Sequence, residues 1–287
     1  MRGQKNVATA MRRPNGELSI VSEPLNTFYS GRARELPLIR GCIVLVETLV
    51  LGTRVLLHSA NVSLEEEEEE ITGPMVWGVI TVSLILAIVL FLITPLFLVH
   101  YLDPHLGSSL ISNIVEGIFR IGIFVAYLGA MNLLPDIRRV WAYHGAEHKT
   151  VNAYEDGAPL EVNSVKRYST AHIRCGTGFL LAVLVIAIIV FAFLGCPEMW
   201  LRVLSRIVLI PVIAALGYEV TRLGAAYAHN RIIRTLLAPG MALQSMTTRE
   251  PDDGQLEVAI SALERVIEDD KENAGKFLED SPAISQR

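Results

Sequence analysis

The stretch "MVWGVITVSLILAIVLFLITPLFLV" (residues 75–99) contains 25 residues and no charged side chain. A helix of that length exceeds the hydrocarbon core of a bilayer, which is about 30 Å thick, so it can cross with some tilt. The composition agrees: 51% of the chain is hydrophobic and only 19% is charged, and the mean hydropathy is +0.41. These features predict a mainly α-helical integral membrane protein.

Three further apolar segments have about the length that a membrane span needs. Residues 176–195 carry no charge at all, and residues 111–134 carry only Glu116 and Arg120. These two lie four residues apart on one helical face, where they can pair with each other. The fourth segment is 201–220, which is interrupted by Arg202, Arg206 and Glu219. We therefore expect about four transmembrane helices.

The expected topology also places charges at matching depths. The second span enters from outside and the fourth begins there, so Glu116 should lie level with the arginines of the last span. We predict that Glu116 contacts Arg206 or Arg202 across helices. The alternative is a pair with Arg120 inside its own helix, at the favourable spacing of four residues.

Residues 42–57 are harder to assign, because they are apolar enough to touch lipid but include Glu47 and Arg54. About sixteen residues are too few for a comfortable span. We interpret this segment as a re-entrant or interfacial helix rather than a crossing.

The positively charged residues test this count of spans. With four spans, the N-terminal region, the 135–175 loop and the C-terminal region all fall on one side, and together they hold many Lys and Arg. The opposite side receives only residues 100–110 and 196–200, which contain none. The positive-inside rule therefore predicts that both termini and the 135–175 loop are cytoplasmic. No basic patch with interleaved aromatics indicates a nucleic-acid partner.

The segments outside the bilayer divide by composition. Residues 1–41 include a hairpin signal around Pro14-Asn15-Gly16, and residues 58–74 form an acidic loop with six consecutive glutamates, Glu65 to Glu70. Within 135–175 we expect a helix over 138–155. The remaining expectations are cytoplasmic helices over 221–270, with 221–237 continuing the last span and 255–270 amphipathic, and a disordered tail over 271–287. Such a cytoplasmic face would suit a cytosolic protein partner.

The motif "YHGAEHKTVNAYEDG" (143–157) carries the strongest chemical signal in the chain. His144 and His148 lie one helical turn apart, so both imidazoles can reach one Zn²⁺ ion. Glu147 lies on the adjoining flank, where a carboxylate can take a proton from water, as in metal-dependent hydrolases. The plainer alternative is a polar surface helix that binds no metal.

A third protein ligand must come from elsewhere in the chain. Cys175 and His172 in "AHIRCGTGF" lie just before the third span, and Glu219 ends the last one. Each has an ordinary structural alternative: Cys175 as a small buried thiol, His172 as an interfacial polar tip, and Glu219 as a partner of Arg222. The sequence leaves these three candidates open.

Two functions from different classes fit these features. The first is a metal-dependent hydrolase, with zinc or another divalent metal at the cytoplasmic face and Glu147 as general base. The second is a non-enzymatic scaffold or biogenesis factor, in which the polar helix binds a cytosolic partner and any metal is structural. Three protein ligands with an open position favour catalysis, whereas four favour a structural role.

Several segments together resemble a known family. They are "RRPNGELS" (12–19), "PLIRGCIVLVETLVLG" (37–52), the His144 motif, "HIRCGTGFLL" (172–181), "GYEV" (217–220) and "LQSMTTREPDDGQLEVAI" (243–260). In this order they resemble the YqhQ-like bacterial membrane proteins, a family of unknown function sometimes labelled as predicted metal-dependent enzymes. The resemblance implies a multi-pass protein of the bacterial cytoplasmic membrane with no assigned activity. It also implies a Gly-rich stretch ahead of the "MRG" that opens this sequence.

Overall fold

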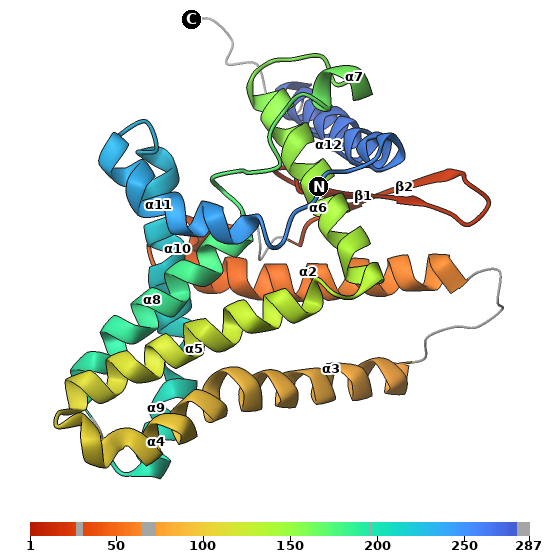
Figure 1. Cartoon of the computed structure of the whole chain (residues 1–287). Helices are drawn as coiled ribbons and strands as arrows, with labels where there is room; N and C mark the ends of the chain where they lie inside the picture. Colours follow the sequence, from red (N-terminus) through yellow and green to blue (C-terminus); the bar gives the residue numbers. More distant parts are fainter. Residues whose placement is uncertain (27–30, 65–72, 196, 280–287) are drawn as a thin grey trace, which may run out of the picture.

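The structure is a computed structural model that describes residues 1–26, 31–64, 73–195 and 197–279. Helices dominate these ranges, and the sheet found in them is one antiparallel hairpin. Figure 1 shows long helices in its lower part and a smaller unit above them. We call this unit the head and define it as β1, β2, α6, α7 and α12.

The strands are β1 (Asn6–Arg12) and β2 (Leu18–Pro24). The helices as far as α6 are η1 (Arg32–Glu35), α2 (Ile39–Leu64), α3 (Gly73–Ile88), the π-helix η3 (Val89–Ile93), α4 (Thr94–Leu106), α5 (Ser109–Met131) and α6 (Pro135–Glu155). The rest are α7 (Val162–Val165), α8 (Gly176–Leu194), α9 (Met199–Val208), α10 (Ile210–Ala226), α11 (Arg231–Gln244) and α12 (Asp253–Glu279).

Four helices in the described ranges are long and apolar enough to cross a membrane. They are Ile39–Val62, the continuous helix Gly73–Leu106, Ser109–Met131 and Gly176–Leu194. The bent pair α9 and α10 would make a fifth. The expected spans at 75–99, 111–134 and 176–195 correspond to three of these helices, while the fourth expected span, 201–220, corresponds to the bent pair.

The bend between α9 and α10 was not expected from the sequence. The two helices meet at Leu209 with an angle of 46°. Pro211 lies in the first turn of α10, where it has no N–H to donate to the carbonyl of Ile207 and its ring crowds the preceding turn. The carbonyl of Ile207 instead accepts from the backbone N–H of Leu209, which tightens the end of α9.

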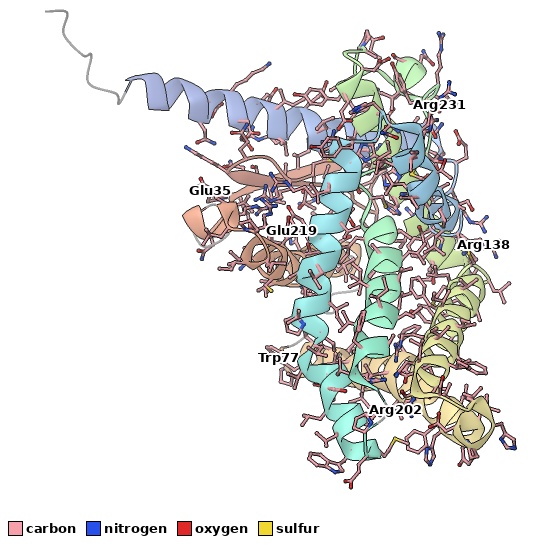
Figure 2. The ribbon with its side chains drawn as sticks, turned by 90° about the vertical axis from the view of Figure 1, so that its left-hand side faces the viewer. Glu35, Trp77, Arg138, Arg202, Glu219 and Arg231 are labelled. Atoms are coloured by element: carbon pink, nitrogen blue, oxygen red, sulfur yellow. The ribbon has the colours of Figure 1, made fainter. Side chains whose placement is uncertain are left out.

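Helix α2 is longer than the sixteen residues expected for 42–57, because it runs for 26 residues. Both charges that suggested a short helix have partners from the N-terminal region. Glu47 is only 3% exposed and its two oxygens bind Arg2 and Arg34, each at 2.5 Å. Arg54 pairs with Glu23 of β2 at 3.2 Å. Figure 2 shows α2 almost end-on beside the steep α10, so the two helices cross.

The continuous helix Gly73–Leu106 extends past residue 99, where we expected the span to end, and has a π-helical stretch in its middle. Pro95 explains part of this irregularity, because it cannot donate to the carbonyl four residues earlier, which is that of Phe91. The Phe91 carbonyl instead accepts from Nε of Arg120 in α5, at 2.9 Å. The irregular segment is thereby tied to α5.

A buried cluster of charges joins this helix with α5 and α9. Glu116, 1% exposed, lies 2.6 Å from Arg120, 3.2 Å from Arg202 and 2.9 Å from Arg206. The contacts across helices and the contact within α5 therefore both exist. Asp103 of α4 adds a second carboxylate, 2.9 Å from Arg202. Phe191 of α8 covers the cluster, with its ring centroid 4.3 Å from the Arg206 guanidinium carbon.

The head is built on the packing of α6 against α12. Its buried core consists of Ala146, Ala153, Val165, Leu256, Ala259 and Ile260. The hairpin packs on α12, and its turn is at the expected place, since Gly16 adopts a φ of +86°. The apolar stripe expected over 255–270 is the face that α12 buries, with Leu256 and Ile260 in the core.

Two expectations about the C-terminal region were wrong. Residues 221–237 do not continue the last span, because α10 ends at Ala226 and α11 begins after a turn, with the Asn230 side chain accepting from the Ile232 N–H. Helix α11 runs through Pro239 and Gly240 to Gln244. Helix α12 continues to Glu279, although we expected disorder from residue 271. The glutamates 65–70 and the last eight residues lie outside the described ranges.

The charge cluster gives a prediction about stability. The change Glu116→Gln removes the carboxylate that the three buried arginines share. Among their described partners, Asp103 is then the remaining carboxylate. Because breaking a buried ion pair costs about 3–5 kcal/mol, we expect a clearly lower unfolding temperature in detergent. Glu264→Gln on the exposed face of α12 is the matched control. Equal unfolding temperatures for the two variants would show that the cluster does not hold the helices together.

Candidate metal centre

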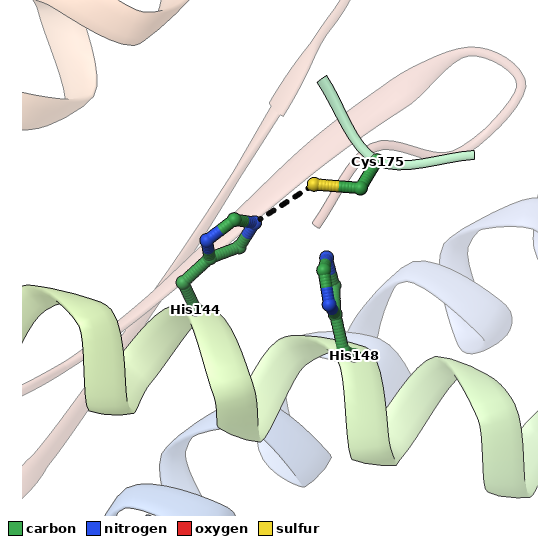
Figure 3. A group of neighbouring side chains, drawn as sticks. All are labelled: His144, His148 and Cys175. Atoms are coloured by element: carbon green, nitrogen blue, oxygen red, sulfur yellow. Dashed lines mark hydrogen bonds between the residues drawn. The ribbon is translucent and has the colours of Figure 1, made fainter. Parts of the chain in front are cut away.

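Helix α6 carries both histidines of the motif toward the start of α8 (Figure 3). It starts with Pro135 in its first turn and ends before Gly157, whose φ of +72° favours glycine. His144 and His148 are one turn apart, and their ring centroids are separated by 4.4 Å. His148 is buried and His144 is partly buried. Their rings therefore share one face of the helix, close to the core of the protein.

Cys175 completes the group from the opposite side. It is the N-cap residue of α8, and its Sγ accepts from the Thr177 N–H at 3.4 Å. The same sulfur lies 3.3 Å from Nε2 of His144 (Figure 3). One donor atom from each of His144, His148 and Cys175 lies within 4.8 Å of the other two. A tetrahedral zinc ion needs N–N and N–S separations of roughly 3.3–3.6 Å, so small side-chain movements suffice.

Side chains of α6 hydrogen-bond to the segment between α6 and α8, and these bonds hold Cys175 close to the two histidines. Asn152 donates to the carbonyls of Ser169 and Ala171, at 2.9 and 3.1 Å. The buried Lys149 donates to the carbonyl of Lys166 at 2.9 Å. The cysteine is 31 residues from His144 in the sequence, but these bonds fold the intervening chain back on the helix.

Backbone carbonyls orient both imidazole rings. Nδ1 of His144 lies 2.8 Å from the Thr247 carbonyl, and Nδ1 of His148 lies 2.6 Å from the Thr170 carbonyl. A carbonyl oxygen only accepts, so each Nδ1 must carry the proton. In a neutral imidazole this leaves the lone pair on Nε2, and Nε2 of His144 is the atom beside Cys175. Such outer partners are a regular feature of histidines that ligate metals.

The electrostatics of the group favour a thiolate. Burial by itself raises the pKa of Cys175, but hydrogen bonds from His144, His148 and Thr177 outweigh it and lower the pKa to about 5. Burial likewise opposes charge on His144, yet the bonds to Cys175 and Thr247 raise its pKa. These shifts describe a Cys175 thiolate paired with a His144 imidazolium, and a metal ion that binds the thiolate would displace the Nε2 proton.

Two nitrogens and one thiolate are a donor set that suits zinc. His144, His148 and Cys175 fit such an ion in chemistry and in spacing. The structure brings no fourth His, Cys, Asp or Glu of the described ranges into this group. The group can thus provide three protein ligands.

The other predicted site residues lie outside this group. Glu147 is exposed on the flank of α6. His172 lies near His148, with 5.8 Å between ring centroids, but its Nε2 faces Glu155 at 3.5 Å. The backbone N–H and carbonyl of His172 are both held by the Gln244 side chain, at 3.0 and 2.9 Å.

Glu219 is remote from the group and has another role. Its carboxylate binds the Arg40 guanidinium through both oxygens and accepts from the Leu38 N–H at 3.0 Å. Leu38 has a φ of +66°, which is unusual for a residue other than glycine. Glu219 therefore secures the start of α2 against α10. Neither a metal-ligand role nor the alternative pair with Arg222 agrees with these contacts.

Sequence reasoning missed Thr170, Thr247 and Gln244. The first two act through their carbonyl oxygens, which every residue type possesses, so no side-chain pattern indicates them. Gln244 is 1% exposed and sits within "LQSMTTREP", a segment noted only for the family resemblance. A buried glutamine in an apolar helix is the one signal that could have pointed to it.

Comparison with known proteins identifies the family. The model of a family described as "Protein of unknown function (DUF1385)" matches residues 36–269. The chain belongs to this family. It is also 30% identical over 279 residues to "Uncharacterized protein YqhQ" of Bacillus subtilis (strain 168), and the match covers 92% of this chain and 88% of the relative. No solved structure matches the chain.

Membership of DUF1385 confirms the resemblance drawn from the sequence but assigns no activity, because both printed descriptions leave the function open. The matched range includes all three residues of the group and all of the long apolar helices from α3 to α10. For this DUF1385 protein, chemical arguments must come from the site itself.

The group gives a spectroscopic prediction. Cobalt(II) added to the purified protein should produce an intense near-ultraviolet band that arises from a thiolate bonded to the metal. Cys175→Ser should abolish that band and weaken binding, because a ligand and its charge are removed. Cys42→Ser is the matched control, since Cys42 lies in α2 and its sulfur is 3.6 Å from the Pro211 carbonyl. A band that survives in Cys175→Ser would exclude Cys175 as a ligand.

Proposed function

We propose that this DUF1385 protein is a multi-pass membrane protein that binds one divalent metal ion, zinc in the first instance, through His144, His148 and Cys175. We further propose that it acts as a metal-dependent hydrolase. The observation that supports this most is the convergence of the three donor atoms within 4.8 Å. Bound zinc would supply Lewis acidity, which polarises a carbonyl or phosphoryl oxygen of a substrate.

Three protein ligands favour catalysis over a structural role. Structural zinc sites normally have four protein ligands, whereas catalytic sites have three and keep one position open. Among the described residues, no fourth candidate lies within the group. This arrangement supports the hydrolase over the non-enzymatic scaffold, the alternative in which a cytosolic partner binds the polar face of α6.

Glu147 remains our proposed general base. It is next to His148 in the sequence, is exposed, and interacts electrostatically with His144. Its carboxylate lies outside the group of three donors, and we assign to it the role of taking a proton from water. Because Nδ1 of each ring lies at a backbone carbonyl, we assign His144 and His148 as metal ligands through Nε2 rather than as proton carriers.

The proposed membrane placement puts this site at the cytoplasmic surface of a bacterial membrane. The helix Gly73–Leu106, α5, α8 and the pair α9–α10 would cross, and both termini would be cytoplasmic. The described connections opposite the head, residues 107–108, 195 and 197–198, contain no Lys or Arg, as expected of an outer face. We keep α2 in the interface, since its Glu47 and Arg54 pair with side chains of the N-terminal region.

The decisive measurement is metal content by elemental mass spectrometry on protein purified in detergent without chelators. We expect about one zinc, or another transition metal, per chain in the wild type. His144→Ala/His148→Ala should lose it because two ligands are removed. His58→Ala/His229→Ala, two histidines outside the site, should retain it. Metal-free wild-type protein that also takes up none when zinc is added would overturn the proposal.

One further variant distinguishes a ligand from a base, and one binding assay distinguishes an open site from a closed one. Glu147→Gln should retain the metal. If this variant lost the metal, Glu147 would be a ligand instead of the base. In the cobalt-loaded wild type, added acetohydroxamate should shift the visible absorption bands, because an open position accepts an outside ligand. Unshifted bands at saturating acetohydroxamate would indicate a closed, structural site.

A further inference from the structure

The end of α10 and most of α11 form a surface outside the candidate metal site. We call residues 220–242 the elbow. Helix α10 ends at Ala226, the chain turns, and α11 folds back beside it from Arg231. Leu237 of α11 packs on Gly224, where an added Cβ would lie 3.0 Å from the leucine Cδ2. The elbow is therefore a packed structural unit rather than a loose extension.

The elbow lies level with the first turn of α8. Gly240 approaches Gly178 so closely that a Cβ on Gly240 would lie 3.4 Å from the Gly178 Cα. Gly178 is the third residue of α8, a helix that can span a membrane. If α8 begins at the cytoplasmic interface, α11 lies at that same depth. A helix at this depth faces lipid headgroups on one side and acyl chains on the other.

Apolar side chains on the elbow are exposed to a degree that water alone would not favour. Ile232 and Leu236 are each 71% exposed, and they are four residues apart on one stripe of α11. Leu223 and Tyr227, at the end of α10, are 57% and 56% exposed. The opposite face of α11 packs on α8. This stripe matches the apolar side of an interfacial helix, with a tyrosine at the boundary.

The charges of the elbow have one sign. Residues 220–249 contain no Asp or Glu, although the whole chain has a net charge of −5. Arg222, Arg231 and Arg234 are exposed, and within the described ranges none of them has an ion-pair partner. Figure 2 shows Arg231 at the edge of the molecule. A positive surface next to an apolar stripe is complementary to an anionic lipid leaflet.

Two hollows in this surface could receive a headgroup. One is lined by Ile173, Ala228, Arg234, Leu237 and Met241, and combines one arginine with apolar walls. The other contains Arg222 together with Thr221 and Tyr218. Both hollows adjoin the segment that leads into Cys175, since Ile173 lines the first and Arg174 the second.

We propose that the elbow is a docking surface for anionic phospholipids. Arg222, Arg231 and Arg234 bind the phosphate groups, while Ile232 and Leu236 enter the acyl region. Each arginine near an anionic leaflet contributes about a factor of five in affinity, so three contribute roughly a hundredfold. This proposal depends on the membrane placement of α8 and not on the presence of a metal.

The test is lipid binding to the full-length protein in non-ionic detergent, measured by native mass spectrometry and by thermal unfolding. Phosphatidylglycerol should bind and raise the unfolding temperature more than phosphatidylcholine does. Arg222→Gln/Arg231→Gln/Arg234→Gln should remove that preference. The control Arg167→Gln/Arg265→Gln/Lys271→Gln changes three exposed cations, one shortly after α7 and two on α12, and should keep that preference.

Two additional arms make the outcome decisive. Inorganic phosphate should not displace phosphatidylglycerol, and full displacement would indicate a phosphate site instead of a lipid surface. Ile232→Ser/Leu236→Ser should reduce the binding of both lipids. Equal binding of the two lipids by the wild type, or an unchanged preference in the triple arginine variant, would overturn the proposal. Zinc content should be the same in all these variants, so a failure here is distinct from a failure of the metal site.

Discussion

One buried carboxylate, that of Glu116, holds together helices that are far apart in the sequence. It is 1% exposed and is shared by Arg120 of its own helix and by Arg202 and Arg206 of α9. Charges in an apolar layer are tolerated only when they are paired and hydrogen-bonded. Arg120 extends the network to the carbonyl that Pro95 leaves free. This constraint fixes how α9 lies against α5 and η3.

The candidate metal group of His144, His148 and Cys175 depends on that arrangement of helices, because α5 and α8 lead directly to its residues. Helix α5 ends at Met131 and α6 starts at Pro135, so α5 leads almost directly into the helix that carries His144 and His148. Cys175 is the last residue before α8. Because α5 packs beside α8, the two ends that supply the ligands are neighbours. The site thus lies where the head meets the long helices, and a movement between these parts would alter its geometry.

The carbonyl oxygens that orient the histidines come from two further segments. Thr170 belongs to the loop that folds back along α6, and Thr247 follows α11. Helix α11 is also the core of the elbow, for which we propose contact with anionic lipid. One helix therefore borders both surfaces, and Gln244 at its end holds the backbone of His172 in the loop before Cys175. This proximity gives a physical route by which lipid at the elbow would affect the metal group.

The sequence alone determined the helical class, three of the long apolar helices, the hairpin turn and the pair His144–His148, because each is encoded by local composition or by spacing within a few residues. It also narrowed the partners of Glu116 to three arginines, all of which bind it. The tertiary structure decided what depends on distant contacts. It brought Cys175, rather than His172 or Glu219, next to the two histidines, since loop bonds to α6 hold that segment in place. Helix α2 is longer than the sequence suggested, because Arg2 and Arg34 neutralise Glu47. Helices α10 and α11 are separate, although the sequence suggested one continuous helix. Local sequence patterns indicate which side chains of a segment will be buried. They do not indicate which distant carbonyl, cation or thiol will contact that segment in the folded protein.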